Sequence, residues 1–305
     1  MKKQGILVVG SANMDLVASA ARFPAPGETV LGAGFGIYPG GKGANQAVCA
    51  AKLGGDVLFL GKIGDDLFGE KLSRGLKENG VRLDRLLVAG DAPTGTALIA
   101  VDGNGENEII VVPGSNMELL PADVRRARPA FDAVRVLLLQ LEIPLATVTA
   151  AAEIAHARGA VVVLNPAPAR PLPPKLLALV DYLTPNETEL GQLSGLPVTG
   201  IPAAVRAARA LLARGVKNVV VTLGEQGALF VDGTSSRRFP ARRVNPVDTT
   251  GAGDAFNGAL ALAIADGRPV GDAIPFANAA AALSVTRRGA QSSMPTMREV
   301  RRFLD

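Results

Sequence analysis

The sequence predicts an α/β protein with a mostly parallel central sheet flanked by helices on both faces, together with a small β-sheet lid. Short β-rich runs alternate with amphipathic segments along most of the chain. Two regions break this alternation and favour antiparallel ribbons. In addition, 48% of the 305 residues are apolar, which is ample material for a buried core.

The runs that we expect to form the central sheet are apolar and separated by helical stretches such as Leu67 to Lys77. They are ILVVG (6–10), VLFLG (57–61), VRVLLLQL (134–141), AVVVLNP (160–166), LVDYLTPN (179–186) and NVVVTLG (218–224). Strands that alternate with helices in this way form parallel sheets covered on both faces.

The two exceptional regions are residues 16–38, rich in Gly and Pro, and residues 96–112, which alternate around a DGNG turn. Both patterns are typical of antiparallel ribbons. We expect them to form a lid over the crevice at the C-terminal ends of the strands, where open α/β sheets bind ligands. No Pro/Ser linker, charge block or fixed-period repeat divides the chain. A single domain over residues 1–305 with an inserted lid is the simplest interpretation.

Composition and charge argue against several classes of protein. The net charge is only +4, and 4% aromatic residues without Trp leave few stacking platforms for nucleic acid. The N-terminal apolar run ends at Gly10, too early for a signal peptide or a membrane span. The single cysteine, Cys49, excludes an intrachain disulfide and a thiolate metal cluster. We expect a cytoplasmic protein that binds neither nucleic acid nor membrane and that favours anionic small molecules.

The stretch VDTTGAGDAFNGALALAIA (247–265) is the most informative for chemistry. Gly251 and Gly253 precede an Ala-rich pattern that predicts a helix, so backbone N–H groups can converge there on an anion. Asp254, at the start of that helix, could accept a proton from an attacking hydroxyl. For an isolated GAGD, an ordinary glycine turn with a helix cap is the commoner explanation.

Other polar residues follow expected strands and allow two interpretations. Asn13, Asp15 and Glu142 could bind neighbouring hydroxyls at strand C-terminal ends, or they could lie in ordinary turns. Asn186 and Glu189, three residues apart, match a capping box. As an oxygen-rich pair they could also serve Mg²⁺ through waters, since this ion keeps much of its hydration.

The stretch GIYPGGKGANQAV (36–48) resembles a phosphate-binding P-loop, but Gly43 stands where that motif needs Ser or Thr. The loop must therefore hold something else. The single histidine, His156, is expected at a solvated position in mid-helix, and Cys49 is expected to be packed and inert. Hydrolysis by a Ser–His triad has little support.

Six stretches carry a family resemblance: GGKGANQA (40–47), NPAPAR (165–170), TPNETE (184–189), TLGEQG (222–227), DTTGAGDAFNGAL (248–260) and RRGAQSSMP (287–295). Together they resemble the ribokinase / phosphofructokinase-B family of carbohydrate kinases, in order over essentially the whole chain. The resemblance implies transfer of phosphate from ATP to the 5-hydroxyl of D-ribose, giving ribose 5-phosphate and ADP. A related kinase for deoxyribose, another sugar or a nucleoside is the alternative. A non-catalytic sugar-binding sensor is an alternative of another class.

The resemblance also implies roles for individual residues. Asp254 would be the catalytic base, beside an anion hole formed by Gly251, Ala252 and Gly253. The sugar would be bound by Asp254 with Asn13, Asp15, Gly40, Gly41, Lys42, Asn45 and Glu142. The bare backbone of the Gly40–Gly41 pair would approach the sugar, and a side chain at Gly41 would occupy the substrate's place.

For the nucleotide, the implied contacts are Asn186, Thr222, Gly224, Gly227, Gly253 and Asn278. Glu189 and Asn186 would serve the Mg²⁺ that accompanies ATP, through waters. K⁺ would lie beside the anion hole, bound mostly by backbone carbonyls of residues at Asp248, Thr250, Ser284, Arg287, Gly289 and Ser293. The family resemblance also suggests a homodimer that shares its lid sheets.

Overall fold

A computed structural model describes residues 5–305 and contains a central sheet with the order β14-β13-β12-β11-β10-β9-β1-β4. Its strands are β1 (Gly5–Val9), β4 (Val57–Leu60), β9 (Val134–Leu139), β10 (Val161–Leu164), β11 (Tyr182–Leu183), β12 (Asn218–Thr222), β13 (Ala228–Val231) and β14 (Ser236–Phe239). Neighbours from β4 through β12 pair in parallel. The predicted mostly parallel sheet is confirmed. Antiparallel pairing of β13 and β14 at one edge was not foreseen.

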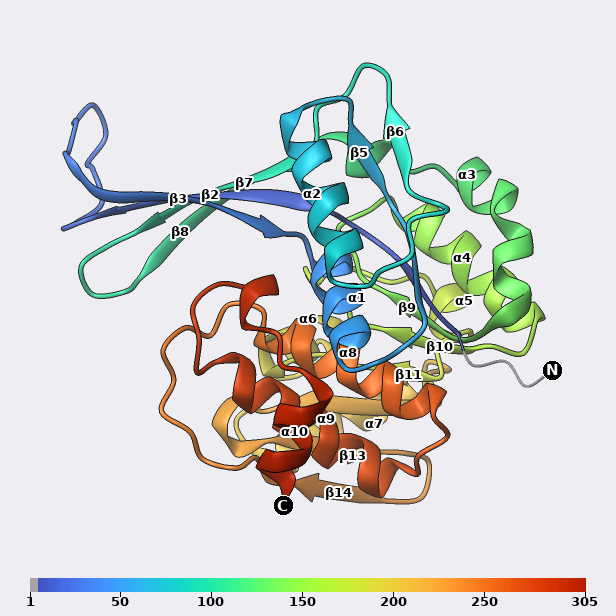
Figure 1. Cartoon of the computed structure of the whole chain (residues 1–305). Coiled ribbons are helices and arrows are strands. Elements are labelled where there is room, and N and C mark those ends of the chain that lie inside the picture. The colour runs from blue at the N-terminus through green and yellow to red at the C-terminus, as the bar shows by residue number, and fades with distance from the viewer. Residues whose placement is uncertain (1–4) are drawn as a thin grey trace.

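Helices cover both faces of this sheet, as predicted (Figure 1). Alternate residues of β1 enter different cores: Ile6 and Val8 join one buried cluster, and Leu7 and Val9 join the other. The first cluster is covered by α1 (Lys42–Lys52), α2 (Leu67–Glu78), α8 (Ala252–Ala265), α9 (Val270–Ser284) and α10 (Met297–Leu304). The second is covered by α3 (Pro121–Arg126), α4 (Leu145–Ala157), α5 (Pro174–Leu177), α6 (Glu187–Ser194) and α7 (Ile201–Leu212).

A second sheet projects from the body of the molecule (Figure 1) and has the order β3-β2-β7-β8. Its strands are β2 (Asn13–Ala20), β3 (Gly32–Gly40), β7 (Gly95–Val101) and β8 (Asn107–Val112). The pairs β2–β3 and β7–β8 are antiparallel, whereas β2 and β7 join the two ribbons in parallel. We call this four-stranded sheet the lid sheet.

The first two strands of the lid sheet, β2 and β3, extend beyond the segment that the sequence indicated. The expected segment, 16–38, lacks both the start of β2 and the end of β3 at Gly40. Asn13 and Asp15 therefore lie within strand β2 of this sheet, and neither at the C-terminal end of β1 nor in an ordinary turn, the two placements that the sequence allowed. The reason is that Asn and Asp are uncommon in strands, so the local pattern did not indicate one.

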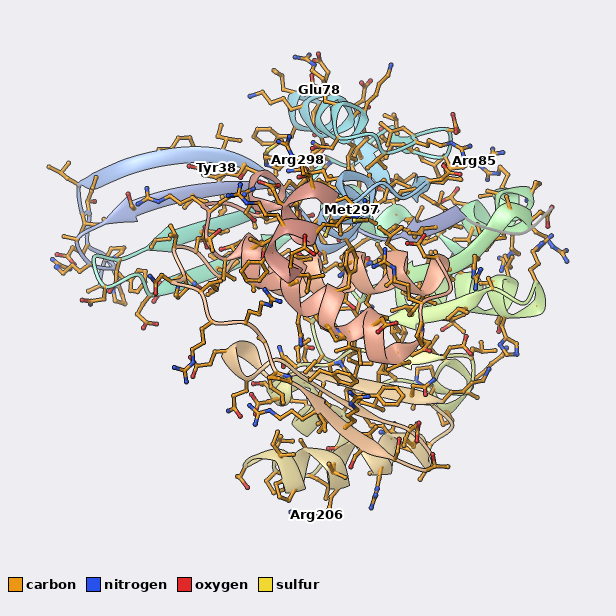
Figure 2. The ribbon with its side chains drawn as sticks, turned by 60° about the horizontal axis from the view of Figure 1, so that its bottom comes forward. Tyr38, Glu78, Arg85, Arg206, Met297 and Arg298 are labelled. Atoms are coloured by element: carbon orange, nitrogen blue, oxygen red, sulfur yellow. The ribbon has the colours of Figure 1, made fainter. Side chains whose placement is uncertain are left out.

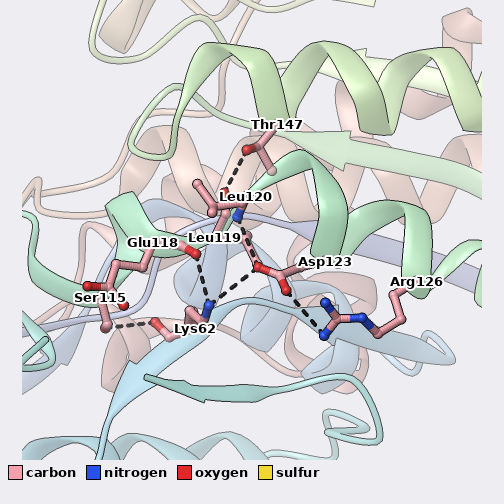
Figure 3. Close-up of polar contacts among 8 residues, drawn as sticks. All are labelled: Lys62, Ser115, Glu118, Leu119, Leu120, Asp123, Arg126 and Thr147. Atoms are coloured by element: carbon pink, nitrogen blue, oxygen red, sulfur yellow. Dashed lines mark hydrogen bonds and ion pairs between the residues drawn. The ribbon is translucent and has the colours of Figure 1, made fainter. Parts of the chain in front are cut away.

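Polar contacts join the base of the lid sheet to the body (Figure 3). After β8 the chain forms the short 3-10 helix η1 (Gly114–Glu118), and between β4 and β7 it forms the small parallel pair β5 (Lys62–Gly64) and β6 (Leu87–Ala89). Lys62 Nζ donates to the carbonyl oxygen of Glu118 at 2.9 Å and lies 3.3 Å from Asp123 Oδ2. Asp123 also accepts from the backbone of Leu120 at the start of α3.

His156 and Cys49 lie in the environments that the sequence predicts. His156 is exposed on α4, and Cys49 is fully buried on α1, where burial raises the pKa of its thiol to about 12. In Figure 2, Glu78 at the end of α2 and Arg206 on α7 lie on opposite sides of the molecule, and Tyr38 projects from the lid strand β3. Among residues 5–305, no helix is long and apolar enough to cross a membrane.

Candidate active site

The start of α8 forms the centre of the site. Gly251 is its N-cap and has the left-handed φ of 75°, which glycine adopts without strain. The helix has no side-chain cap. Ala252 donates to the carbonyl oxygen of Thr249, but within residues 5–305 the amides of Gly253 and Asp254 have no acceptor. Unpaired amides at a helix N-terminus are suited to bind an anion.

Asp254 lies next to these amides and is only 6% exposed. Its Oδ2 accepts from Asn45 Nδ2, and its Oδ1 accepts from Gln46 Nε2, both at 2.9 Å. Burial raises the pKa of Asp254, while Lys42 and the two amides oppose this rise. A buried carboxyl whose pKa is raised is a suitable general base.

Lys42 is the cation that balances this site. Burial lowers the pKa of its ammonium, but Asp254, Glu142, Glu189 and Asp15 together outweigh burial, so that its pKa is raised and it stays protonated. These four carboxyls come from α8, the loop after β9, α6 and β2. Lys42 therefore links the acids on the expected sugar side with Glu189 on the expected nucleotide side.

On the expected sugar side, Asp15 and Glu142 are close enough to interact. Burial, followed by repulsion from Glu142 and Asp254, raises the pKa of Asp15 to about 7, although Lys42 lowers it. Glu142 Oε2 accepts from Ser11 Oγ at 2.5 Å and from the backbone N–H of Lys42 at 3.0 Å. No local pattern marks Ser11, which is fully buried and fixes Glu142 through this hydrogen bond.

Asn13 and Asn45 complete the sugar side. Asn13 is held by Asn116, a buried residue of η1 that the sequence did not single out. The Oδ1 atom of Asn45 is buried and has no hydrogen-bond partner within the described part of the chain. Buried polar atoms are nearly always paired, so this acceptor is available for a ligand hydroxyl.

The glycine pair of the GGKGANQA stretch has a different role from the one expected at Gly41. Gly41 has φ of 84°, and a Cβ there would lie 2.6 Å from the backbone N of Asn13 and 2.8 Å from Ala12 Cα. It would collide with the protein, not occupy the substrate's place. At Gly40, a Cβ would lie 2.2 Å from Asp15 Oδ2, so this glycine leaves room for the carboxylate.

A cavity of about 1210 Å³ opens on the other side of the start of α8. All six residues expected to contact a nucleotide line it: Asn186, Thr222, Gly224, Gly227, Gly253 and Asn278. Asn278 donates to the carbonyl oxygen of Phe239 at 3.0 Å, which ties α9 to the end of β14. No sequence motif marks Arg238, Arg242 and Arg243, which also line the cavity. Together they outnumber the two acids of the lining, Glu187 and Glu225, by one positive charge.

Asn186 and Glu189 form the capping box that their spacing indicated. Asn186 Oδ1 accepts from the amide of Glu189 at 2.8 Å, and Glu189 Oε2 accepts from the amide of Asn186 at 2.9 Å. Glu189 Oε1 accepts no hydrogen bond from residues 5–305. Burial raises the pKa of Glu189, although the hydrogen bond from the Asn186 amide and the charge of Lys42 lower it. In the same described range, no cluster of three or more His, Cys, Asp or Glu could hold a metal ion.

The residues expected around K⁺ lie in two neighbouring loops. Asp248 joins these loops, because its Oδ1 accepts from the amide of Thr250 at 2.9 Å and its Oδ2 from the amide of Gly289 at 2.8 Å. The backbone N–H groups of Val247 and Asp248 also donate to the carbonyl oxygen of Val285. Ser284, Arg287 and Ser293 follow along the second loop or border it.

Comparisons with known proteins identify the family of this chain. The family model described as pfkB family carbohydrate kinase matches residues 3–297. The ribokinase of Bacillus subtilis is 43% identical over 301 residues, covering 99% of each chain, and a deoxyribokinase of Salmonella typhi is 41% identical over 300 residues, covering 98% of each. The solved structure of Arabidopsis thaliana ribokinase complexed with ribose and ATP has a TM-score of 0.93 at 35% identity, covering 100% of this chain and 99% of that one. The chain belongs to the pfkB family of carbohydrate kinases.

Proposed function

We propose that this protein is an ATP-dependent kinase that phosphorylates D-ribose at its 5-hydroxyl, giving ribose 5-phosphate and ADP. One observation carries the proposal: the buried carboxyl of Asp254 interacts with the polar cluster of Asp15, Glu142 and Asn45, and the unpaired amide beside it, that of Gly253, lines the cavity of about 1210 Å³. A hydroxyl on one side and a phosphate on the other can both reach them. The Arabidopsis ribokinase structure with ribose and ATP, similar over the whole chain, supports the choice of substrates.

In the proposed reaction, Asp254 accepts the proton of the 5-hydroxyl while the new O–P bond forms and the bond to the ADP oxygen breaks. Phosphoryl transfer has a loose transition state, so most catalysis comes from alignment and from stabilising charge on the transferred group. The amides of Gly251, Ala252 and Gly253 are the proposed anion hole. In this structure the Ala252 amide donates to the Thr249 carbonyl oxygen, so Gly251 and Gly253 supply the donors that have no acceptor within residues 5–305. Lys42 supplies a positive charge on the same side.

The residues fit an ATP-bound Mg²⁺ held through water. Glu189 keeps Oε1 unused, and Asn186 borders the nucleotide cavity. Mg²⁺ prefers oxygen ligands, keeps several waters and needs only one or two protein carboxylates. When bound, the ion would neutralise the charge of the phosphates.

The two loops joined by Asp248 fit a monovalent cation such as K⁺. Carbonyl oxygens can replace the hydration shell of K⁺, and the proposed donors are Thr250, Ser284, Arg287, Gly289 and Ser293 with the carboxylate of Asp248. Such an ion would hold the loop that leads into the anion hole. Initial rates measured in K⁺, Na⁺ and a large organic cation at equal ionic strength test this role.

We also propose that the lid sheet closes over the sugar and pairs with the lid sheet of a second copy of this chain. Side chains on both faces of β8 are exposed, including Ile109, Ile110, Val111 and Val112. An apolar strand with both faces exposed is unusual in a monomer. A molar mass of a monomer in light scattering at micromolar concentration would contradict this dimer.

Measuring ADP release with a panel of sugars tests the main proposal. We expect D-ribose to give the highest kcat/KM, with 2-deoxyribose as the closest competitor, because relatives of both activities match this chain. A nucleoside is less favoured, since the lid sheet and the turn between β2 and β3 offer only Phe23, Phe35 and Tyr38 as aromatic faces. Absence of ADP release with every sugar, despite sugar binding by calorimetry, would instead favour a non-catalytic sensor.

A further inference from the structure

Gln46 occupies a position in which its amide has only one acceptable orientation. The side chain is fully buried, and Nε2 donates to Asp254 Oδ1 at 2.9 Å and to Asn165 Oδ1 at 3.0 Å. Its Oε1 accepts from Gln140 Nε2 at 2.6 Å. A primary amide has two N–H donors, and both are used. Turning the amide over would place Oε1 against two acceptors and Nε2 against a donor.

The neighbouring Asn45 holds Asp254 differently. Its Nδ2 donates to Asp254 Oδ2, but its Oδ1 is buried and has no partner within residues 5–305, so this amide is open to a ligand. Gln46 has no such free acceptor, because its Oε1 accepts from Gln140 Nε2. When a sugar hydroxyl engages Asn45, the contact from Gln46 is therefore the one that keeps the carboxylate of Asp254 in place.

The contacts of Gln46 continue through a buried chain of polar groups to the anion hole. Asn165 donates to the carbonyl oxygen of Thr184 at 3.1 Å, and Thr184 Oγ1 donates to Asn257 Oδ1 at 2.6 Å. Asn257 Nδ2 then donates to the carbonyl oxygen of Gly253 at 2.8 Å. The same network thus contacts both the carboxylate and the turn of α8 that carries the unpaired amides.

Close packing of two helices makes this network possible. Gln46 lies on α1, which packs directly against α8. At Gly258 of α8, a Cβ would lie 2.6 Å from the carbonyl oxygen of Gln46, so only glycine permits this approach. Gln140, at the end of β9, and Asn165, after β10, bring the sheet to the same point.

We propose that Gln46 is a positioning residue that fixes the orientation of the Asp254 carboxylate toward the reacting hydroxyl, with Gln140 and Asn165 setting the direction of its amide. This inference rests on the proposed role of Asp254 as the base. Gln46 itself contacts neither sugar nor nucleotide in this arrangement, because its side chain is enclosed by protein groups.

The test is a steady-state comparison of Gln46→Met with the wild-type enzyme. Met keeps the length of the side chain but removes the donor to Asp254, together with the hydrogen bonds to Asn165 and Gln140. We expect kcat to fall about 10- to 100-fold, because misplacing a reacting group costs on this order, while KM for the sugar stays within about threefold. The carboxylate of Asp254 also loses a hydrogen bond that stabilises its charged form, so its pKa should rise. In a plot of kcat against pH, the acid limb should therefore move to higher pH by about one unit.

The charged groups around the Asp254 carboxylate must be considered when this profile is interpreted. Lys42 on α1, Glu142 after β9, Asp15 on β2 and Glu189 on α6 all interact with it or with its neighbours. None of them is changed in the variant. A shift of the acid limb in Gln46→Met is therefore attributable to the lost amide donor.

Two further variants separate positioning from loss of stability. Gln140→Met leaves both donors of Gln46 in place and removes only the contact to its Oε1, so kcat should fall less but in the same direction. If Gln46→Met does not fold, Gln140→Met alone tests whether the orientation of the Gln46 amide affects kcat. Thr147→Val removes a buried hydrogen bond of 2.6 Å to the Leu119 carbonyl oxygen, away from the site, and serves as the control for stability.

The inference is overturned if kcat and the acid limb of folded Gln46→Met and Gln140→Met match those of the wild type, or if Thr147→Val shifts the acid limb equally. The assays use whichever sugar the wild-type enzyme phosphorylates fastest. The comparison of the variants therefore remains valid if the substrate is a sugar other than ribose. An unchanged rate in Asp254→Asn would separately refute the assignment of the base.

Discussion

Asn116 donates from its side-chain Nδ2 to Oδ1 of Asn13 at 2.7 Å, across the junction between the lid sheet and the body. The same nitrogen lies within hydrogen-bond distance of the carbonyl oxygens of Ala12 and Pro113, and Asn116 Oδ1 accepts from the backbone N–H of Ala12. Because the oxygen of Asn13 accepts from Asn116, the direction of the Asn13 amide is fixed, and its nitrogen is the group that can donate to a sugar hydroxyl.

This contact predicts that Asn116→Ala impairs sugar binding although residue 116 does not touch the sugar. We expect KM for ribose to rise about tenfold, with a smaller effect on kcat, since one oriented hydrogen bond is lost. A double-mutant cycle with Asn13→Ala tests the mechanism. If the two residues act through one contact, the loss in the double variant will be smaller than the sum of the single losses. Strict additivity would mean that Asn116 acts elsewhere.

The role of Asp254 predicts a separation of kcat from KM. Asp254→Asn removes the base but keeps the size of the side chain, so we expect kcat to fall at least about 100-fold with little change in ribose affinity. Single-turnover rates with saturating ATP and calorimetric binding of ribose measure the two effects separately. Near-normal turnover in a variant whose melting temperature matches the wild type would contradict the assignment.

The junction in Figure 3 predicts a difference between two ion pairs of Asp123. The Lys62 side chain is 16% exposed and that of Asp123 is 9% exposed, whereas Arg126, 3.6 Å from Asp123, is 75% exposed. Removing Lys62 leaves the buried carboxylate of Asp123 with only the exposed Arg126 as a cationic partner, so Lys62→Met should lower the free energy of unfolding by roughly 2 kcal/mol or more. Arg126→Met should change it by less than about 0.5 kcal/mol.

Chemical denaturation of both variants measures this difference. The Arg126→Met variant controls for loss of one positive charge at the same carboxylate. Lys62 also donates to the carbonyl oxygen of Glu118, in the same 3-10 helix η1 that carries Asn116. We therefore expect Lys62→Met, but not Arg126→Met, to raise KM for ribose as well. Equal stability of the two variants would show that the junction does not depend on the buried pair.

How much the sequence could predict depended on how far apart the contacting residues lie. The start of α8 was recognisable because Gly251, Gly253 and Asp254 are adjacent, and the capping box of Asn186 and Glu189 spans three residues. The central sheet was also predictable, since each strand has its own local apolar pattern. Local patterns could not show that β2 pairs in parallel with β7, because that pairing joins distant segments.

The supporting residues of the site were missed for the same reason. Ser11 contacts Glu142 across 131 positions, Gln46 contacts Asp254 across 208, and Asn116 contacts Asn13 across 103. Nothing in the neighbourhood of a single Ser, Gln or Asn indicates such a partner. Only the proximity of Gln46 to Asn45 in GGKGANQA offered a hint. The side chains that orient a site are thus harder to predict than those that react in it.

Asp15 predicts a conflict between binding and stability that depends on pH. Its pKa is raised from 3.8 to about 7, chiefly by burial and then by Glu142 and Asp254, so the folded protein holds this proton more tightly than the unfolded chain. Below about pH 4, Asp15 is protonated in both the folded and the unfolded protein, so it does not lower the stability of the fold. As pH rises toward 7 the unfolded chain ionises first, and the stability of the folded state falls. Above pH 7, Asp15 is ionised in both states, and the loss of stability no longer changes with pH.

Asp15→Asn removes this ionisation and should therefore stabilise the sugar-free protein by roughly 1 to 3 kcal/mol at pH 8, with the gain disappearing near pH 4. The same change should raise KM for ribose strongly, because a carboxylate that accepts from sugar hydroxyls is lost. Thermal unfolding of the two proteins across this pH range measures the first effect. Asp65→Asn, which removes the same charge from an exposed position, is the control. A stability difference that does not vary with pH would show that Asp15 ionises as readily in the folded protein as in the unfolded chain.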